Sequence, residues 1–186
     1  ELMIAISEAN PEFTGMAQAR PNADGEIVEF MSEDPGLVDL SPLKGLPLQG
    51  VYLPESGVSD ISALQGAPLE VLVLGSSEVS DLSPISEAQL IAISFSGSKK
   101  IIDLSPLAGQ PLVEAELLET GISDLSPLEG MELQSLVLGK TNVADLSPLS
   151  GMPLEVIDLH ETAVTDLSPL EGAPLTHLFI ERTEIS

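Results

Sequence analysis

Apolar residues recur along this chain in a fixed pattern, and a five-residue motif marks each period. Its commonest form is Asp-Leu-Ser-Pro-Leu. The seven copies of the motif begin at Asp39, Asp60, Asp81, Asp103, Asp124, Asp145 and Asp166. Neighbouring copies are 21 residues apart, and one extra residue between Asp81 and Asp103 gives a single spacing of 22. Repetition with such a short, constant period predicts a solenoid of stacked units.

Each period also predicts one short strand. Ile157 and Leu159 alternate with Asp158, which places the two apolar side chains on one face of the strand. Six apolar positions recur in every period, and a unit of about 21 residues is too small to bury them alone. We therefore expect the repeats to stack, with parallel strands about 4.8 Å apart.

The second part of each period predicts a tight turn. Ser168 is a candidate N-cap, and Pro169 has the backbone dihedral that suits the first position of a helical turn. Gly172 and Pro174 then end the turn. We expect a single 3₁₀ or extended turn per repeat on the convex side, because the unit leaves no room for a longer helix.

The repeat resembles known bacterial sequences. Its Asp-Leu-Ser-Pro-Leu tail resembles the short leucine-rich repeats of internalin-like surface proteins, and residues 151–170 resemble the repeats of planctomycete-type bacterial proteins. The resemblance implies a right-handed leucine-rich repeat superhelix, an α/β-type solenoid dominated by β-structure, with one parallel sheet of about eight short strands. The turn geometry between residues 85 and 103 is left open, because Glu87 and Gln89 replace the usual glycine and proline. Ala63 likewise replaces a proline.

The two ends of the chain differ from the repeats. Residues 1–26 are expected to form an N-terminal cap, with a short helix over residues 2–8 and a β-hairpin that joins 16–20 to 26–31. The hairpin would cover the open edge of the sheet. Residues 27–186 form the repeat array, which we expect to be truncated because it stops where the next aspartate is due. The last strand, within 175–185, could then pair with a second molecule.

Composition excludes several classes of function. The chain has 30 acidic and 6 basic residues and a formal net charge of -24, so it repels nucleic acid. It has no cysteine, which excludes disulfides and thiolate chemistry. No apolar run is long enough for membrane insertion. A cell-surface or secreted location is slightly favoured over a cytoplasmic one, because an oxidising exterior suits a chain without cysteine.

Two columns of polar residues need a structural interpretation. The motif aspartates could form a row of calcium sites, but each repeat supplies one such carboxylate, and calcium takes six or more oxygen ligands. Acceptance of local backbone amides in a tight corner is the favoured interpretation. A second column is expected to satisfy backbone groups between adjacent turns; it consists of Ser56, Ser77, Ser98, Thr120, Thr141, Thr162 and Thr183.

The candidate binding surface is the face of the sheet that points away from the core, since solenoids bind ligands on their concave side. Carboxylates, apolar groups and cations gather in its C-terminal half. The candidate partner-binding residues are Tyr52, Glu116, Leu118, Glu119, Asp158, His160, Phe179 and Arg182. Tyr52, Phe179 and Arg182 are the candidate anchors, because interfaces favour aromatic residues and arginine.

Catalysis and metal binding are not expected. His160 and Asp158 share a strand face with His177 nearby, but no third ligand is fixed beside them. An open sheet also offers no pocket in which two carboxylates could differ in environment. We therefore expect no enzymatic activity, no cofactor and no metal site.

These observations favour a non-enzymatic module that binds a protein with a basic or mixed-charge surface. One alternative is a structural or adhesive spacer array of a surface protein. Another is an appended regulatory or localising domain of a larger bacterial enzyme such as a serine/threonine kinase, because planctomycete-type arrays are often attached to such domains. Loss of binding on substitution of Glu116, Asp158 and Phe179 would separate a binding face from a spacer.

Overall fold

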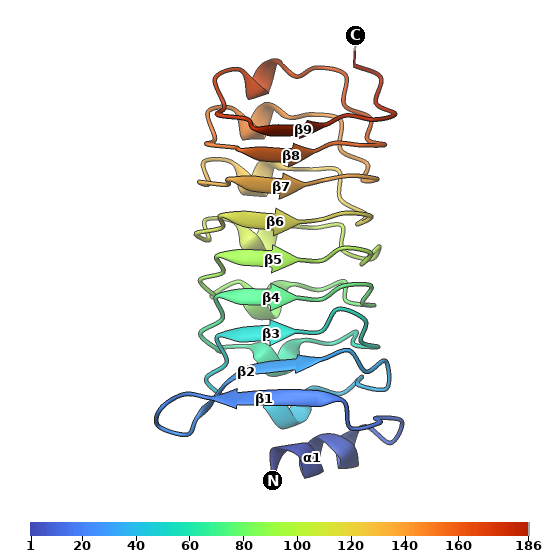
Figure 1. The fold of residues 1–186 in the computed structure, drawn as a ribbon, viewed down its shortest axis with the longest axis vertical. Helices are drawn as coiled ribbons and strands as arrows, with labels where there is room; N and C mark the ends of the chain where they lie inside the picture. Colours follow the sequence, from blue (N-terminus) through green and yellow to red (C-terminus); the bar gives the residue numbers. More distant parts are fainter. Residues whose placement is uncertain (186) are drawn as a thin grey trace.

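The protein is described over residues 1–185 by a computed structural model, which shows a stack of similar turns (Figure 1). Nine strands form one sheet in chain order. β1 pairs with β2 in the antiparallel sense, and every later pair is parallel. The predicted solenoid with one parallel strand per repeat is therefore confirmed.

The strands of the repeats are short. β1 and β2 span Ala17–Pro21 and Ile27–Ser32. The remaining seven have three residues each: β3 (Gly50–Tyr52), β4 (Val71–Val73), β5 (Ala92–Ser94), β6 (Glu114–Glu116), β7 (Ser135–Val137), β8 (Val156–Asp158) and β9 (His177–Phe179). The middle residue points into the core, as at Leu72, which is 0% exposed. Its two neighbours in the strand then point to the opposite face of the sheet.

A single 3₁₀ turn follows on the other side of each repeat, as predicted. The turns are η1 (Ser41–Leu43), η2 (Ser62–Leu64), η3 (Ser83–Ile85), η4 (Ser105–Leu107), η5 (Ser126–Leu128), η6 (Ser147–Leu149) and η7 (Ser168–Leu170). η2 forms although Ala63 replaces proline. Proline therefore favours the turn without being required for it.

The expected N-cap role of Ser168 is wrong. Its side chain accepts no cap hydrogen bond. Asp166 accepts instead, through Oδ1 from the backbone amide of Ser168 at 2.8 Å, while the Ser168 hydroxyl donates to Asp166 Oδ2 at 2.8 Å. A carboxylate two residues earlier reaches the free amide in an Asx turn, which leaves the serine hydroxyl to serve as a donor.

The motif aspartates share the backbone part of this arrangement along the array, and the serine hydroxyl also donates at Asp103, Asp124, Asp145 and Asp166. Each accepts a hydrogen bond from the backbone amide two residues later, at 2.7–2.8 Å. Because these bonds favour the charged form, they lower the pKa of five of the carboxylates. The five are Asp60, Asp81, Asp103, Asp145 and Asp166.

One turn has a different exit. After η1 the chain continues with Lys44 extended (ψ 127°) and Gly45 at a φ of 79°. After η3, where Glu87 replaces that glycine, Ser86 is helical instead (φ -64°, ψ -23°). Glycine adopts a left-handed backbone without a Cβ penalty, and where this glycine is missing the chain leaves the turn by another route.

The serine and threonine column is buried except at Thr183, and its members do not all bond in the same way. Ser98 connects adjacent turns, because its Oγ accepts from the Ser77 amide at 3.0 Å. The threonines donate within their own turn, as Thr120 does to the Leu117 carbonyl at 2.7 Å. The expectation of bonds between turns is therefore wrong for the threonines. Their β-branched side chains have restricted rotamers, and Oγ1 reaches the carbonyl three residues earlier.

The predicted helix and hairpin are present at the N-terminal end. α1 spans Leu2–Ala9 and packs against η1. Figure 1 shows it beside β1, at the end of the stack. Asn10, directly after α1, is 1% exposed and connects the helix to the first repeat. Its Nδ2 donates to the Ile6 and Asp39 carbonyls at 3.0 and 2.9 Å, and its Oδ1 accepts from the Val38 and Asp39 amides at 2.8 and 2.7 Å.

A buried carboxylate holds the next segment of the cap. Asp34 accepts from the Thr14 amide and hydroxyl at 2.7 and 2.6 Å and from the Gly36 amide at 3.0 Å. The hydrogen bond from the Thr14 hydroxyl is the main reason that the pKa of Asp34 is below its usual value. The cap is thus joined to the array by side chains that bond to backbone.

The C-terminal end of the described sheet is more exposed. Leu178 in β9 occupies the inward position and is 40% exposed, whereas Ile157 in β8 is 0% exposed. Phe179 and Ile180 are 42% and 37% exposed. Among residues 1–185, no helix is long and apolar enough to span a membrane.

Candidate functional site

The sheet face consists of the side chains that flank the inward residue of each strand. Strand pairing aligns them in rows. The central row is Met31, Tyr52, Val73, Ser94, Glu116, Val137, Asp158 and Phe179. A row that the sequence analysis overlooked runs beside it: Glu29, Gly50, Val71, Ala92, Glu114, Ser135, Val156 and His177. The alternation of side chains around the inward residue could have identified this row.

The eight candidate binding residues do not form one cluster. Tyr52 lies in β3, three strands from Glu116 in β6 and six from Phe179 in β9. At about 4.8 Å per strand, these separations are about 14 and 29 Å. Seven of the residues lie from β6 onward, and Tyr52 lies apart from them near the cap. The sheet face therefore has two regions with different surroundings.

In the C-terminal region, Asp158 and His160 form a local pair. Asp158 Oδ1 lies 2.7 Å from His160 Nδ1 and accepts a hydrogen bond from the His160 backbone amide at 2.9 Å. The imidazole lies against Gly139, where a Cβ atom would overlap the ring. Within residues 1–185, no three histidine or carboxylate side chains come together as metal ligands. His177 stacks on Phe179 instead, with ring centroids 6.3 Å apart.

A charge ladder runs along one side of this region. Glu119, Lys140, Glu161 and Arg182 occupy equivalent positions in four successive repeats, and all four have left-handed backbones with φ between 55° and 59°. Lys140 Nζ lies 2.9 Å from Glu119, and Arg182 pairs with Glu161. Hydrogen bonding between the first pair lowers the pKa of Glu119 and raises that of Lys140. The candidate anchor Arg182 is therefore already engaged with a carboxylate of its own chain.

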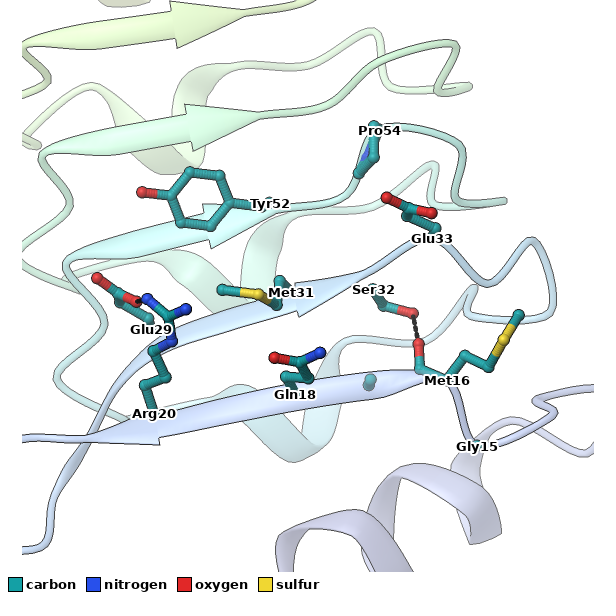
Figure 2. Close-up of a pocket in the computed structure, with 11 residues that line it drawn as sticks. Gly15, Met16, Gln18, Arg20, Glu29, Met31, Ser32, Glu33, Tyr52 and Pro54 are labelled. Atoms are coloured by element: carbon teal, nitrogen blue, oxygen red, sulfur yellow. Dashed lines mark hydrogen bonds and ion pairs between the residues drawn. The ribbon is translucent and has the colours of Figure 1, made fainter.

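The N-terminal region contains a hollow of about 620 Å³, which we call the N-terminal hollow (Figure 2). Met31 lies at its centre, between Gln18 of β1 and Tyr52 of β3. The ion pair of Arg20 and Glu29, 3.1 Å apart, closes one end. The complete lining is Gly15, Met16, Ala17, Gln18, Arg20, Glu29, Met31, Ser32, Glu33, Tyr52 and Pro54.

Two features of the sequence produce this hollow. Gly50 has no side chain, and a Cβ there would come within 2.9 Å of Tyr52 Cε2, so the Tyr52 ring can lie down against its own strand. The antiparallel hairpin then adds β1, whose Gln18 and Arg20 pair with Met31 and Glu29. Of the lining residues, Tyr52 alone was a candidate binding residue from the sequence. The register of the predicted hairpin could have placed Gln18 beside Met31.

No protein-family model matches this chain, and no curated protein is detectably similar to it. Among solved structures, an internalin from Listeria monocytogenes (InlF) is 33% identical, with a TM-score of 0.76. The similarity covers 80% of this chain and 46% of that one, so this chain spans less than half of that structure.

Internalin C2 (InlC2) from the same organism is 23% identical and has a TM-score of 0.82, over 100% of this chain and 84% of that one. The chain is a leucine-rich repeat protein with short, internalin-like repeats. The resemblance to internalin-like repeats and the fold class inferred from the repeat motif are confirmed. The candidate sites lie on this leucine-rich repeat stack, which has a helix and a hairpin at one end.

Proposed function

We propose that this leucine-rich repeat protein is a non-catalytic interaction module that binds a protein partner on its sheet face. The distribution of aromatic residues carries the proposal. The chain has five of them. Phe30 and Phe95 are buried in the core, and Phe13 packs against it. The other two, Tyr52 and Phe179, both lie in the central row of the sheet face, where they could serve as interface anchors.

Charge indicates the kind of partner. The formal net charge is -24, and four of the six basic residues are paired with carboxylates of the same chain. A partner with a basic or mixed-charge surface would therefore associate fastest, and salt would weaken that steering. A surface or secreted location belongs to the same proposal, supported by the absence of cysteine.

The test is a selection of displayed natural protein domains on the intact chain, followed by affinity measurements on two variants. The face variant combines Tyr52→Ser, Glu116→Ser and Phe179→Ser. The control variant combines Gln65→Ser and Glu129→Ser, which lie just after η2 and η5 on the turn side and are exposed. Each variant removes one carboxylate, so the change in net charge is the same.

A domain that binds the sheet face should bind the face variant at least about tenfold more weakly and the control variant as it binds the parent. Circular dichroism should show both variants folded, because the substituted side chains lie outside the core. Binders that respond only to the control variant would contradict the proposal. A spacer array would yield no binder that depends on the sheet face.

A further inference from the structure

We propose that the N-terminal hollow receives an apolar side chain of an extended protein segment that carries a lysine or arginine beside it. The proposal rests on the proposed function and assigns part of the sheet face a specific type of ligand. Apolar lining, unused hydrogen-bonding groups and local charge support it independently.

The apolar part of the lining is suited to an adaptable contact. Met16 is 64% exposed, and Met31, Tyr52 and Pro54 are half-buried around the same space. Methionine side chains are flexible and polarisable, so they can fit more than one apolar group. An occupant that covers Met16 removes apolar surface from water, which favours binding.

The polar part of the lining has hydrogen-bonding capacity to spare. Within residues 1–185, none of the hydrogen bonds or ion pairs uses the Tyr52 hydroxyl, the side-chain amide of Gln18 or the Glu33 carboxylate. Hydroxyl and amide side chains can both donate and accept, which suits the backbone of an extended segment. These groups lie around the apolar centre at Met31, so an occupant could contact both kinds of group.

Charge determines what should stand beside the apolar side chain. The positive charge of Arg20 is compensated by Glu29 at 3.1 Å. Within residues 1–185, Glu33 forms no ion pair. It lies near Met16 and Pro54 at the end of the hollow opposite the Arg20–Glu29 pair. The lining therefore has a net negative charge in a chain whose overall charge is -24. A lysine or arginine of the segment can form a charge-assisted hydrogen bond with Glu33.

The probe for this proposal is a display library of random linear peptides selected on the intact protein. The expected consensus is an apolar residue adjacent to lysine or arginine. The most enriched peptide is then synthesised, and its affinity is measured for four variants: Met31→Ser, Gly50→Ala, Glu33→Gln and Val137→Ser.

Each variant tests one part of the argument. Met31→Ser removes the apolar centre. Gly50→Ala displaces the Tyr52 ring from its position in the lining, because a Cβ there would come within 2.9 Å of Tyr52 Cε2. Each should therefore weaken binding about tenfold. Glu33→Gln should reduce both the affinity and its dependence on salt. Val137→Ser changes the same row four strands from β3, and it should leave the affinity unchanged.

Methionine methyl NMR gives a second reading that does not depend on substitutions. The chain has five methionines. The peptide should shift the signals of Met16 and Met31 and leave those of Met131 and Met152, which are 6% and 4% exposed, in place. A consensus without the apolar and basic pair, no enriched peptide, or binding that leaves Met16 and Met31 unshifted would overturn the proposal.

These results are distinguishable from failure of the proposed function. A domain that depends on the sheet face but not on Met31 or Gly50 would support the proposed function and overturn the assignment of the hollow. A peptide that fills the hollow, without any protein domain that depends on the sheet face, would support the assignment of the hollow and contradict the proposed function.

Discussion

The two ends of the sheet face are built from the same repeat but have different surroundings. At the N-terminal end, Asn10 and Asp34 fix a helix and a hairpin against the first repeat, and the sheet face there is hollowed. At the C-terminal end, Leu178 and Phe179 are partly exposed in β9, and ion pairs between successive repeats lie alongside. Where repeats stack, equivalent side chains align in rows. The N-terminal hairpin lies outside the repeat pattern and places different side chains beside those rows.

This contrast distinguishes what stabilises the core from what shapes the sheet face. In the array, each inward side chain is covered by its equivalents on both sides, so burial depends on having two neighbours. At the N-terminal end the hairpin and α1 supply the second neighbour. The resulting hollow is therefore a consequence of how the end of the core is covered.

The largest expected difference is between two leucines at the same position of two repeats. Leu72→Ala should lower the free energy of unfolding by about 3 kcal/mol, because it leaves a cavity between Val51 and Ile93. Leu178→Ala should lower it by about 1 kcal/mol or less, because Leu178 is already 40% exposed. Urea denaturation of both variants measures the difference. Equal losses would mean that Leu178 is covered in solution as fully as Leu72.

The next largest effect concerns the attachment of the cap. Asn10→Ala should lower the free energy of unfolding by about 2 to 3 kcal/mol, because it removes a buried side chain and leaves the partly buried Val38 and Asp39 amides without their acceptor. The matched control is Asn142→Ala, at an exposed position of the array, which should change stability by less than about 0.5 kcal/mol. Hydrogen exchange should show the loss first in α1 and the hairpin. A loss spread evenly along the array would contradict a locally fixed cap.

The smallest effect is a difference in acid sensitivity. The pKa of Asp34 in the folded protein is below its ordinary value, so its contribution to stability is complete above the unfolded pKa and is lost as pH falls through the folded pKa. Asp34→Asn should therefore reduce the loss of stability on acidification, which urea midpoints between about pH 5 and pH 3 would show.

The comparison variant for this prediction is Asp145→Asn. The pKa of Asp145 is also lowered, but among residues 1–185 the hydrogen bonds of its carboxylate reach only Ser147 in the same turn. Acid should therefore loosen one exposed turn there, whereas at Asp34 it breaks the attachment of Thr14. Lower protection of the cap amides against hydrogen exchange at low pH, relative to their intrinsic exchange rates, would support this distinction in the parent protein. An equal response in turn η6 would contradict it.

Much of the fold follows from local pattern in the sequence. The 21-residue period, the alternation at Ile157 and Leu159, and the proline at the start of most turns predicted the strands and 3₁₀ turns, because these features report local geometry and burial directly. The hydrogen bonds were less predictable. Ser168 and Asp166 are both plausible caps in sequence, and which one reaches the amide depends on the exact path of the turn.

For the candidate binding surface too, the sequence determined one part and the tertiary structure the other. The sequence determined the rows of the sheet face, because the period of the repeat fixes which residues align. It did not determine that Tyr52 would lie apart from the other seven candidates, or that Met31 and Gln18 would line a hollow with it. Only the tertiary structure decided this, because the hollow depends on a non-repeating hairpin packing beside the first repeat and on a ring lying against Gly50.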